Sequence, residues 1–136
     1  MAVVVAETLS SAADPRALSL RAPVTYAGVR GIADRVQHLT VRDSIGDVPL
    51  EASDEPADPG GFPNYRHWRA TRPVHGAIAV SYRALVQPPP GRGPPFGIRA
   101  YAGGVTGAGS GFLVLPEHQG RVRSRVHWDL SDLASG

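Results

Sequence analysis

The 136-residue sequence contains no cysteine and no lysine, and each absence excludes particular kinds of chemistry. Without cysteine the chain has no disulfide bond, no thiolate zinc site and no cysteine nucleophile. Without lysine it cannot form the Gly-Lys-Ser/Thr end of a phosphate-binding loop. All 14 basic residues are arginines, and the formal net charge is only +2, which indicates neither a nucleic-acid partner nor a membrane partner.

Long apolar runs are also missing from the chain. No stretch reaches the length of a membrane-spanning helix. The apolar start, residues 1–6, is too short for the core of a signal peptide, and no basic residue precedes it. We therefore expect the chain as given to be soluble, with no signal peptide in it and no membrane partner, while its compartment stays open.

Glycine and proline are abundant, with 16 and 13 residues, and they indicate many turns between short elements. The apolar share of 42% is ordinary for a globular protein, and 136 residues suffice for one domain with its own core. We expect a single β domain over residues 1–136.

Alternating apolar and polar residues predict most of the strands. The pattern is clearest over residues 78–86, where apolar side chains recur at every second position. Residues 18–24 show one buried face in the same way and are expected to lie antiparallel to the first strand, residues 3–5. Residues 112–115 are apolar throughout, which is typical of a strand buried on both faces. Further strands are predicted over residues 36–43, 65–71 and 122–130.

The connections between these strands have patterns of their own. Residues 29–35 carry apolar side chains at roughly helical spacing, so a short helical turn is expected there. Residues 45–48 are typical of a hairpin turn, residues 51–64 of an acidic surface loop, and residues 87–96 of an extended, proline-rich connection. The prediction is an all-β fold, an antiparallel β-sandwich or saddle-like domain of about eight short strands with at most that one helical turn.

Candidate metal ligands are scattered along the chain. Asp54, Glu55 and Asp58 lack the regular spacing of a calcium-binding loop and fit a solvated loop. No two of the five histidines have the His-x-x-x-His spacing that places two imidazoles beside one metal ion. We therefore expect no metal site. One alternative stays open, a site assembled across strands from His67, His75 or His127.

The most unusual stretch is residues 103–111, which contains five glycines. It lacks the lysine of a phosphate loop, and its glycines do not follow the order of a dinucleotide-binding fingerprint. Ser110 is not in a nucleophile elbow, because position 108, where Gly-x-Ser-x-Gly requires glycine, is alanine. We expect a connection between two strands, whose glycines permit positive φ and close backbone approach.

Three arginines alternate along the predicted last strand: Arg121, Arg123 and Arg125. They form either a contact for an anion or a partner, or an ordinary solvated face. Trp68 and Trp128 also lie on predicted strands and are expected to anchor the core.

Four segments carry a family likeness. Residues 23–43 form a proline-led, tyrosine-containing turn followed by a strand that ends in Arg-Asp, and residues 67–69 are His-Trp-Arg. Residues 79–84 contain Val-Ser-Tyr, and residues 111–116 are Gly-Phe-Leu-Val-Leu-Pro. In this order the segments resemble the N-terminal domain of bacterial glycyl-aminopeptidase-type metallopeptidases, the PDZ-containing relatives of the thermolysin-like aminopeptidases.

The resemblance implies a non-catalytic, saddle-shaped β domain that packs on a catalytic domain of its own or of a separate chain. In that family the catalytic domain carries His-Glu-x-x-His and binds zinc. No histidine in this chain is followed directly by glutamate, so the His-Glu-x-x-His motif is absent. We therefore expect that the chain is not an enzyme by itself and holds no cofactor. The partners that the resemblance implies are the catalytic domain and a peptide.

Within this resemblance, the glycine-rich segment is expected to face the peptide-binding cleft through Gly103, Gly104, Thr106, Gly107, Gly109, Ser110 and Gly111. The alternative is an independent β-sandwich module that binds carbohydrate or protein. Such a module would use the arginine face and exposed aromatic side chains among Trp68, Tyr82, Tyr101 and Trp128.

Overall fold

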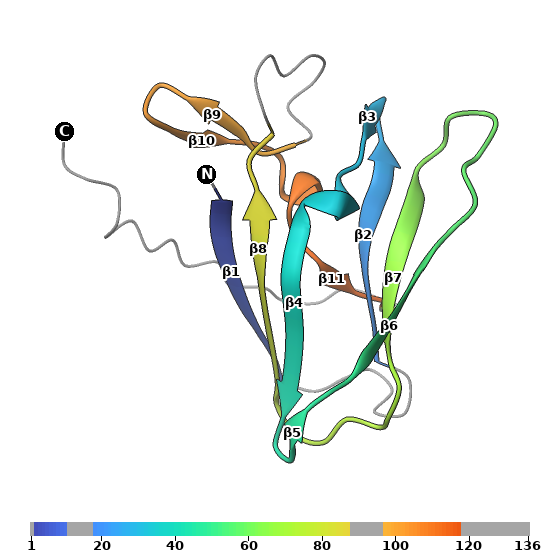
Figure 1. Ribbon diagram of the computed structural model, residues 1–136, viewed down its shortest axis with the longest axis vertical. Helices are drawn as coiled ribbons and strands as arrows, with labels where there is room; N and C mark the ends of the chain where they lie inside the picture. The colour runs from blue at the N-terminus through green and yellow to red at the C-terminus, as the bar shows by residue number, and fades with distance from the viewer. Residues whose placement is uncertain (1, 11–17, 88–96, 118–136) are drawn as a thin grey trace.

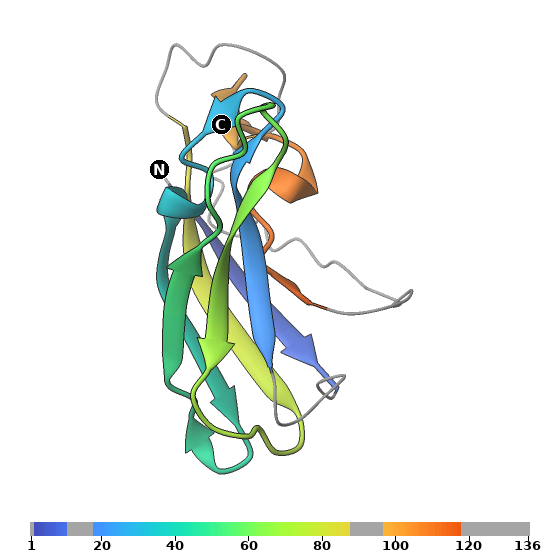
Figure 2. The same cartoon turned by 90° about the vertical axis from the view of Figure 1, so that its right-hand side faces the viewer.

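The chain folds into two antiparallel sheets that pack face to face, as seen in a computed structural model that describes residues 2–10, 18–87 and 97–117 (Figures 1 and 2). One sheet has the strand order β1-β8-β4-β5, and the other has the order β11-β2-β7-β6 with β3 attached to β2. A separate hairpin, β9–β10, completes the strands of the described residues. The all-β, antiparallel architecture predicted from the alternation is therefore confirmed.

The four-stranded sheet consists of β1 (Ala2–Leu9), β8 (Ile78–Leu85), β4 (Val36–Asp43) and β5 (Gly46–Asp47). Along β8 buried and exposed side chains alternate as the sequence predicts. β1 pairs with β8, and β2 lies in the other sheet, so the first two strands are not neighbours in one sheet. The buried side chains of these strands lie on one face of the sheet, and the two sheets pack together through their buried faces.

The five-stranded sheet consists of β11 (Leu115–Pro116), β2 (Ser19–Tyr26), β7 (Asn64–Ala70), β6 (Leu50–Asp54) and the short β3 (Val29–Arg30). The predicted acidic loop over 51–64 was partly wrong, because its first residues form β6. Cross-strand charge pairs take the place of apolar alternation there: Asp54 lies opposite Arg66, and their side chains form two hydrogen bonds of 2.6 and 2.7 Å.

The predicted strand over 112–115 was also wrong in its extent. Only Leu115 and Pro116 pair with β2, and Leu115 is half exposed. Residues 112–114 instead form a connection after the 3₁₀ turn η2 (Gly109–Gly111), and Phe112 and Val114 pack against the core from it. A continuous apolar run does not distinguish such a buried connection from a buried strand.

The turns form where the sequence predicts them, several of them at glycines. η1 (Ala33–Arg35) is the short helical turn expected within 29–35, and β5 forms the hairpin expected over 45–48. In the hairpin of β9 (Arg99–Tyr101) and β10 (Gly104–Thr106), Ala102 and Gly103 have φ of 47° and 81°. Positive φ at both central positions is the type I′ geometry that matches the twist of paired strands.

The core lies between the two sheets. The four-stranded sheet contributes Val5, Val41, Ile78, Val80, Tyr82 and Ala84, the five-stranded sheet contributes Leu20, Ala22 and Trp68, and connections contribute Val48, Val74, Ile98 and Val114. Each large side chain that is buried in this way contributes about 1.5–3 kcal/mol. The prediction that Trp68 anchors the core is confirmed, since only 9% of it is exposed.

Several predictions fall on segments that the structure does not describe. These are the strand over 122–130 with Trp128, the arginines at 121, 123 and 125, the two histidines after residue 117, and most of the proline-rich connection. Within the described ranges, no helix is long and apolar enough to cross a membrane.

Candidate functional site

The glycine-rich segment is an ordered hairpin and turn rather than a long loop. β9–β10 lies at the end of the sandwich away from β5, and η2 and β11 then run beside β2 (Figures 1 and 2). Gly103 provides the positive φ of the hairpin. At Gly107 a Cβ atom would lie 2.9 Å from the carbonyl oxygen of Gly97, so only glycine allows this close approach. Both roles predicted for the glycines are therefore observed.

The phenol of Tyr82 holds this segment on the core. Its oxygen accepts a 2.9 Å hydrogen bond from the buried Val114 N–H and lies 3.1 Å from the Phe112 carbonyl oxygen. It also lies 3.0 Å from Oε1 of Glu7, on the neighbouring strand β1. Tyr82 belongs to β8, so one side chain connects the four-stranded sheet to the connection that leads into β11.

The Glu7 carboxyl is the third partner of this phenol. A phenol has a single hydrogen, and two acceptors, the Phe112 carbonyl and an ionised Glu7, would compete for it. Burial raises the pKa of Glu7 above its usual value and outweighs the hydrogen bond with Tyr82, which acts in the opposite direction.

A small apolar pocket lies where this segment meets the outer face of the five-stranded sheet. Its volume is about 140 Å³, and its lining consists of Arg21, Pro23, Tyr26, Tyr65, Ser110, Leu113 and Leu115. The Arg21 guanidinium stacks on the Tyr65 ring, 4.6 Å from the ring centroid. Ser110 and Leu113 form the wall supplied by the glycine-rich segment. A cavity of this size fits one aliphatic side chain and is too small for a drug-sized ligand.

A buried histidine lies beside this pocket on the same face of the sheet. His67 is opposite Arg21 in the strand register, and only 6% of it is exposed. Its Nε2 lies 2.8 Å from Oε1 of Glu55, and its Nδ1 lies 3.0 Å from Oε1 of Glu117, although this second pair is not aligned for a hydrogen bond. We call these three side chains the His67 cluster.

The geometry of the His67 cluster does not suit a metal ion. The two ring nitrogens point away from each other, so the two carboxylates lie on opposite sides of the imidazole and cannot converge with it on one ion. Among the described residues no group of three His, Cys, Asp or Glu side chains could hold a metal.

The electrostatic environment of Glu117 links the cluster to the pocket. Burial acts to raise the pKa of Glu117, but the neighbouring Ser19 hydroxyl and the His67 ring outweigh it and hold the pKa below its usual value. The Arg21 guanidinium of the pocket acts in the same direction. Glu117 is thus an ionised carboxylate at neutral pH, close to an apolar pocket and an arginine.

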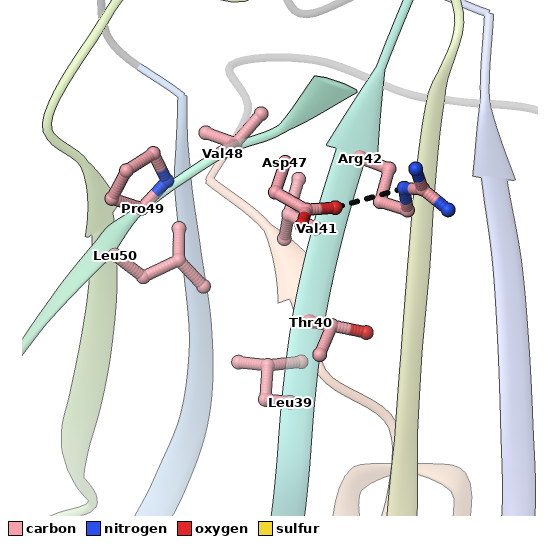
Figure 3. Close-up of a pocket in the computed structure, with 8 residues that line it drawn as sticks. All are labelled: Leu39, Thr40, Val41, Arg42, Asp47, Val48, Pro49 and Leu50. Atoms are coloured by element: carbon pink, nitrogen blue, oxygen red, sulfur yellow. Dashed lines mark ion pairs between the residues drawn. The ribbon is translucent and has the colours of Figure 1, made fainter.

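A larger cavity of about 400 Å³ lies away from this pocket, where the chain crosses from β5 in one sheet to β6 in the other (Figure 3). Leu39 and Leu50 face it from two strands, and Arg42 forms a 2.8 Å ion pair with Asp47 at its rim. Both charged side chains are largely exposed and neutralise each other. The cavity therefore offers shape but no unpaired polar group, and we do not assign a function to it.

The predicted cleft-facing residues divide into two groups. Gly103, Gly104 and Thr106 lie on the β9–β10 hairpin, which exposes 73% of Tyr101 and 41% of Val105. Gly107, Gly109 and Gly111 shape the turn that follows, and Ser110 alone among the predicted residues lines the pocket.

Sequence reasoning misses Arg21, Tyr65 and Glu117. Arg21 and Tyr65 lie on the polar faces of β2 and β7, and an aromatic side chain on a polar face is the one sequence feature that could have identified them. Glu117 has no such feature, because its neighbours depend on the pairing of β11 with β2.

Comparison of the chain with protein-family models, with curated proteins and with solved structures finds no match.

Proposed function

We propose that the chain is a non-catalytic β domain that packs on the catalytic domain of a glycyl-aminopeptidase-like zinc metallopeptidase and helps to bound its peptide-binding cleft. The observation that carries the proposal is the pocket between Ser110 and Leu113 of the glycine-rich segment and the Arg21–Tyr65 stack. The segment that the family resemblance assigns to the cleft contributes Ser110 to this concave apolar surface.

Two further features support this role. The β9–β10 hairpin carries Tyr101 and Val105 away from the core, and exposed apolar side chains on a projecting hairpin are suited to contact with another domain. The pocket itself combines an apolar lining with the carboxylate of Glu117 and the guanidinium of Arg21 nearby. A peptide whose apolar N-terminal side chain lies next to its charged terminus would match this apolar lining and these neighbouring charges.

Calorimetric titration with short peptides tests the binding part of the proposal. We expect tripeptides with a small aliphatic N-terminal residue to bind with a Kd of about 1 mM, as suits a shallow contact that forms only part of a cleft. Ser110→Trp should fill the pocket and abolish the heat of binding. Ser81→Trp, at an exposed position on the other sheet, is the matched control and should bind like the wild type. Equal binding by both variants would contradict the pocket assignment.

The coding sequence tests the parent protein independently. The proposal expects an in-frame His-Glu-x-x-His in the polypeptide to which this domain belongs, or in a catalytic chain that copurifies with it. A native protein whose intact mass equals that of the 136 residues, and which copurifies with no such chain, would contradict the metallopeptidase assignment.

An independent binding module is the second candidate, and the pocket with its two tyrosines is the observation that favours it. The aromatic residues considered for a carbohydrate platform differ in exposure: Trp68 and Tyr82 are buried, while Tyr101 is exposed on the hairpin. The same titration with monosaccharides and disaccharides separates the candidates. Saccharide binding that Ser110→Trp abolishes, without any peptide binding, would favour the module.

A further inference from the structure

The outer edge of β1 differs from the other sheet edges of the described residues. β1 pairs with β8 over its full length, from Ala2 opposite Leu85 to Leu9 opposite Ile78, without a bulge. On its other side no described strand pairs with it. Along these eight residues, every second residue therefore directs its backbone N–H and C=O groups to the unpaired edge.

The remaining edges each have a feature that discourages pairing with another strand. At the opposite edge of the same sheet β5 has only two residues, and β4 beside it has a register shift near His38, whose φ is 54°. β6 is five residues long and carries Glu51 and Asp54. β11 has two residues, one of them Pro116, which lacks a backbone donor. Bulges, charges, proline and short length are the usual protection of an edge strand, and β1 has none of them except Glu7.

The side chains of β1 are compatible with a second copy of the same strand. Val4, Ala6 and Thr8 lie on the outer face and are exposed, with 73% of Val4 accessible. They are small or β-branched and uncharged, which suits cross-strand contact. The one charged side chain, Glu7, faces inward to Tyr82. The strand thus presents no charge on its outer face.

The alternation of faces restricts how two copies can pair. In an antiparallel pair about a two-fold axis perpendicular to the sheet, residues directly opposite each other must lie on the same face. The two such registers that pair most of β1 place the axis at Val5 or at Ala6. In the first register Glu7 lies opposite Val3, and in the second it lies opposite Val5, so the two copies of Glu7 are never opposed. The edge is self-complementary in both registers.

We propose that two copies of this chain associate through antiparallel pairing of β1 with β1, which joins their four-stranded sheets into one continuous sheet. The partner is a second copy, because the identical strand supplies both the unpaired backbone edge and the uncharged outer face that the pairing requires. This association is independent of the peptide pocket, which lies on the other sheet.

Sedimentation equilibrium of the full chain over a dilution series tests the proposal, and the expected result is a reversible change from twice the monomer mass to the monomer mass. The double variant Val4→Lys with Ala6→Lys places like charges opposite each other in either register and should raise the dimer Kd at least about tenfold. Ala79→Lys with Ser81→Lys makes the same charge change on the same outer face of β8, opposite Thr8 and Ala6, and should leave the Kd unchanged. Circular dichroism establishes that each variant is folded.

The absence of cysteine gives a second, independent test. Under mild oxidation, either Val5→Cys or Ala6→Cys should form an interchain disulfide, depending on which residue lies on the two-fold axis, while Ser81→Cys should not. A monomer at all concentrations, with no crosslinking by either variant, would overturn the proposal. A monomer whose β1 amides are nevertheless protected from hydrogen exchange would overturn it as well, because another part of the chain would then cover the edge.

Discussion

This small sandwich contains two charged clusters that differ in how well their polar groups are paired. The first is centred on Asp43, at the end of β4, whose side chain is fully buried and accepts hydrogen bonds from Arg72 and from the backbone N–H groups of Ile45, Gly46 and His75. The second is the His67 cluster, in which Nδ1 of the buried ring has no aligned hydrogen-bond partner.

The difference separates a structural cluster from a candidate functional one. Arg72 also donates to the carbonyl oxygens of Gly46 and Asp47, so the Asp43 cluster joins the β4–β5 hairpin to the connection between β7 and β8. Its hydrogen bonds and the charge of Arg72 hold the pKa of Asp43 far below its usual value. The His67 cluster borders a pocket, and its 3.0 Å contact between Nδ1 and Glu117 is poorly aligned, so it is the less rigidly paired of the two clusters.

The largest effect is expected from Asp43→Ala. It removes every hydrogen bond that the carboxylate accepts and leaves the Arg72 guanidinium and three backbone donors without it, so the melting temperature should fall by about 10 °C. Asp47→Ala, which removes an exposed ion pair with Arg42, is the control and should change the melting temperature little. Similar melting temperatures for the two variants would show that the Asp43 cluster is not the structural one.

Tyr82→Phe should have the next largest effect. The variant keeps the ring in the core but removes the acceptor of the buried Val114 N–H, which should lower the free energy of unfolding by about 1–3 kcal/mol. Hydrogen exchange should accelerate first over residues 112–116, because the anchor of that connection is lost. Uniform acceleration across both sheets would contradict a local anchoring role.

His67→Ala should destabilise the protein less, by about 1 kcal/mol, because one contact of the ring is already poorly aligned. The change should appear as faster exchange at the β11 edge, where Glu117 loses its neighbour. His75→Ala is the control, since only the backbone of His75 contacts the Asp43 cluster. A loss as large as that of Asp43→Ala would mean that both clusters are structural.

The smallest effect concerns pH and Glu7. A folded-state pKa above the usual value means that the folded protein binds the proton more tightly than the unfolded chain does. Stability from this group is therefore complete below the usual pKa of about 4.5 and is lost as pH rises through the folded pKa. Glu7→Gln should flatten the pH profile of the melting temperature above that range, and a profile that this variant leaves unchanged would contradict the role of Glu7.

The sequence predicts the layered part of the fold well. Alternation over 78–86 and 36–43 corresponds to β8 and β4, because each strand buries one face and exposes the other. Alternation fails where charge pairs replace apolar contacts, as in β6, and where an apolar run packs as a connection, as at 112–114. In those places the neighbours of a residue, rather than its own type, determine the structure.

The pocket could not be predicted from the sequence for the same reason. Arg21, Tyr65 and Ser110 are far apart along the chain, and the β2–β7 register together with the Tyr82 anchor brings them to one face. The glycine pattern did identify a segment with positive φ and a close backbone approach, which are local properties. It did not identify what that segment packs against.

The central claim is that the glycine-rich segment and the outer face of the five-stranded sheet form a peptide-binding surface. The most direct measurement is a two-dimensional amide NMR titration of the labelled protein with the tripeptide. The account predicts shifts concentrated at Arg21, Tyr65, Ser110 and Leu113, and none around Asp43. Shifts around Leu39 and Leu50, at the larger cavity, or no shifts at any concentration, would contradict it.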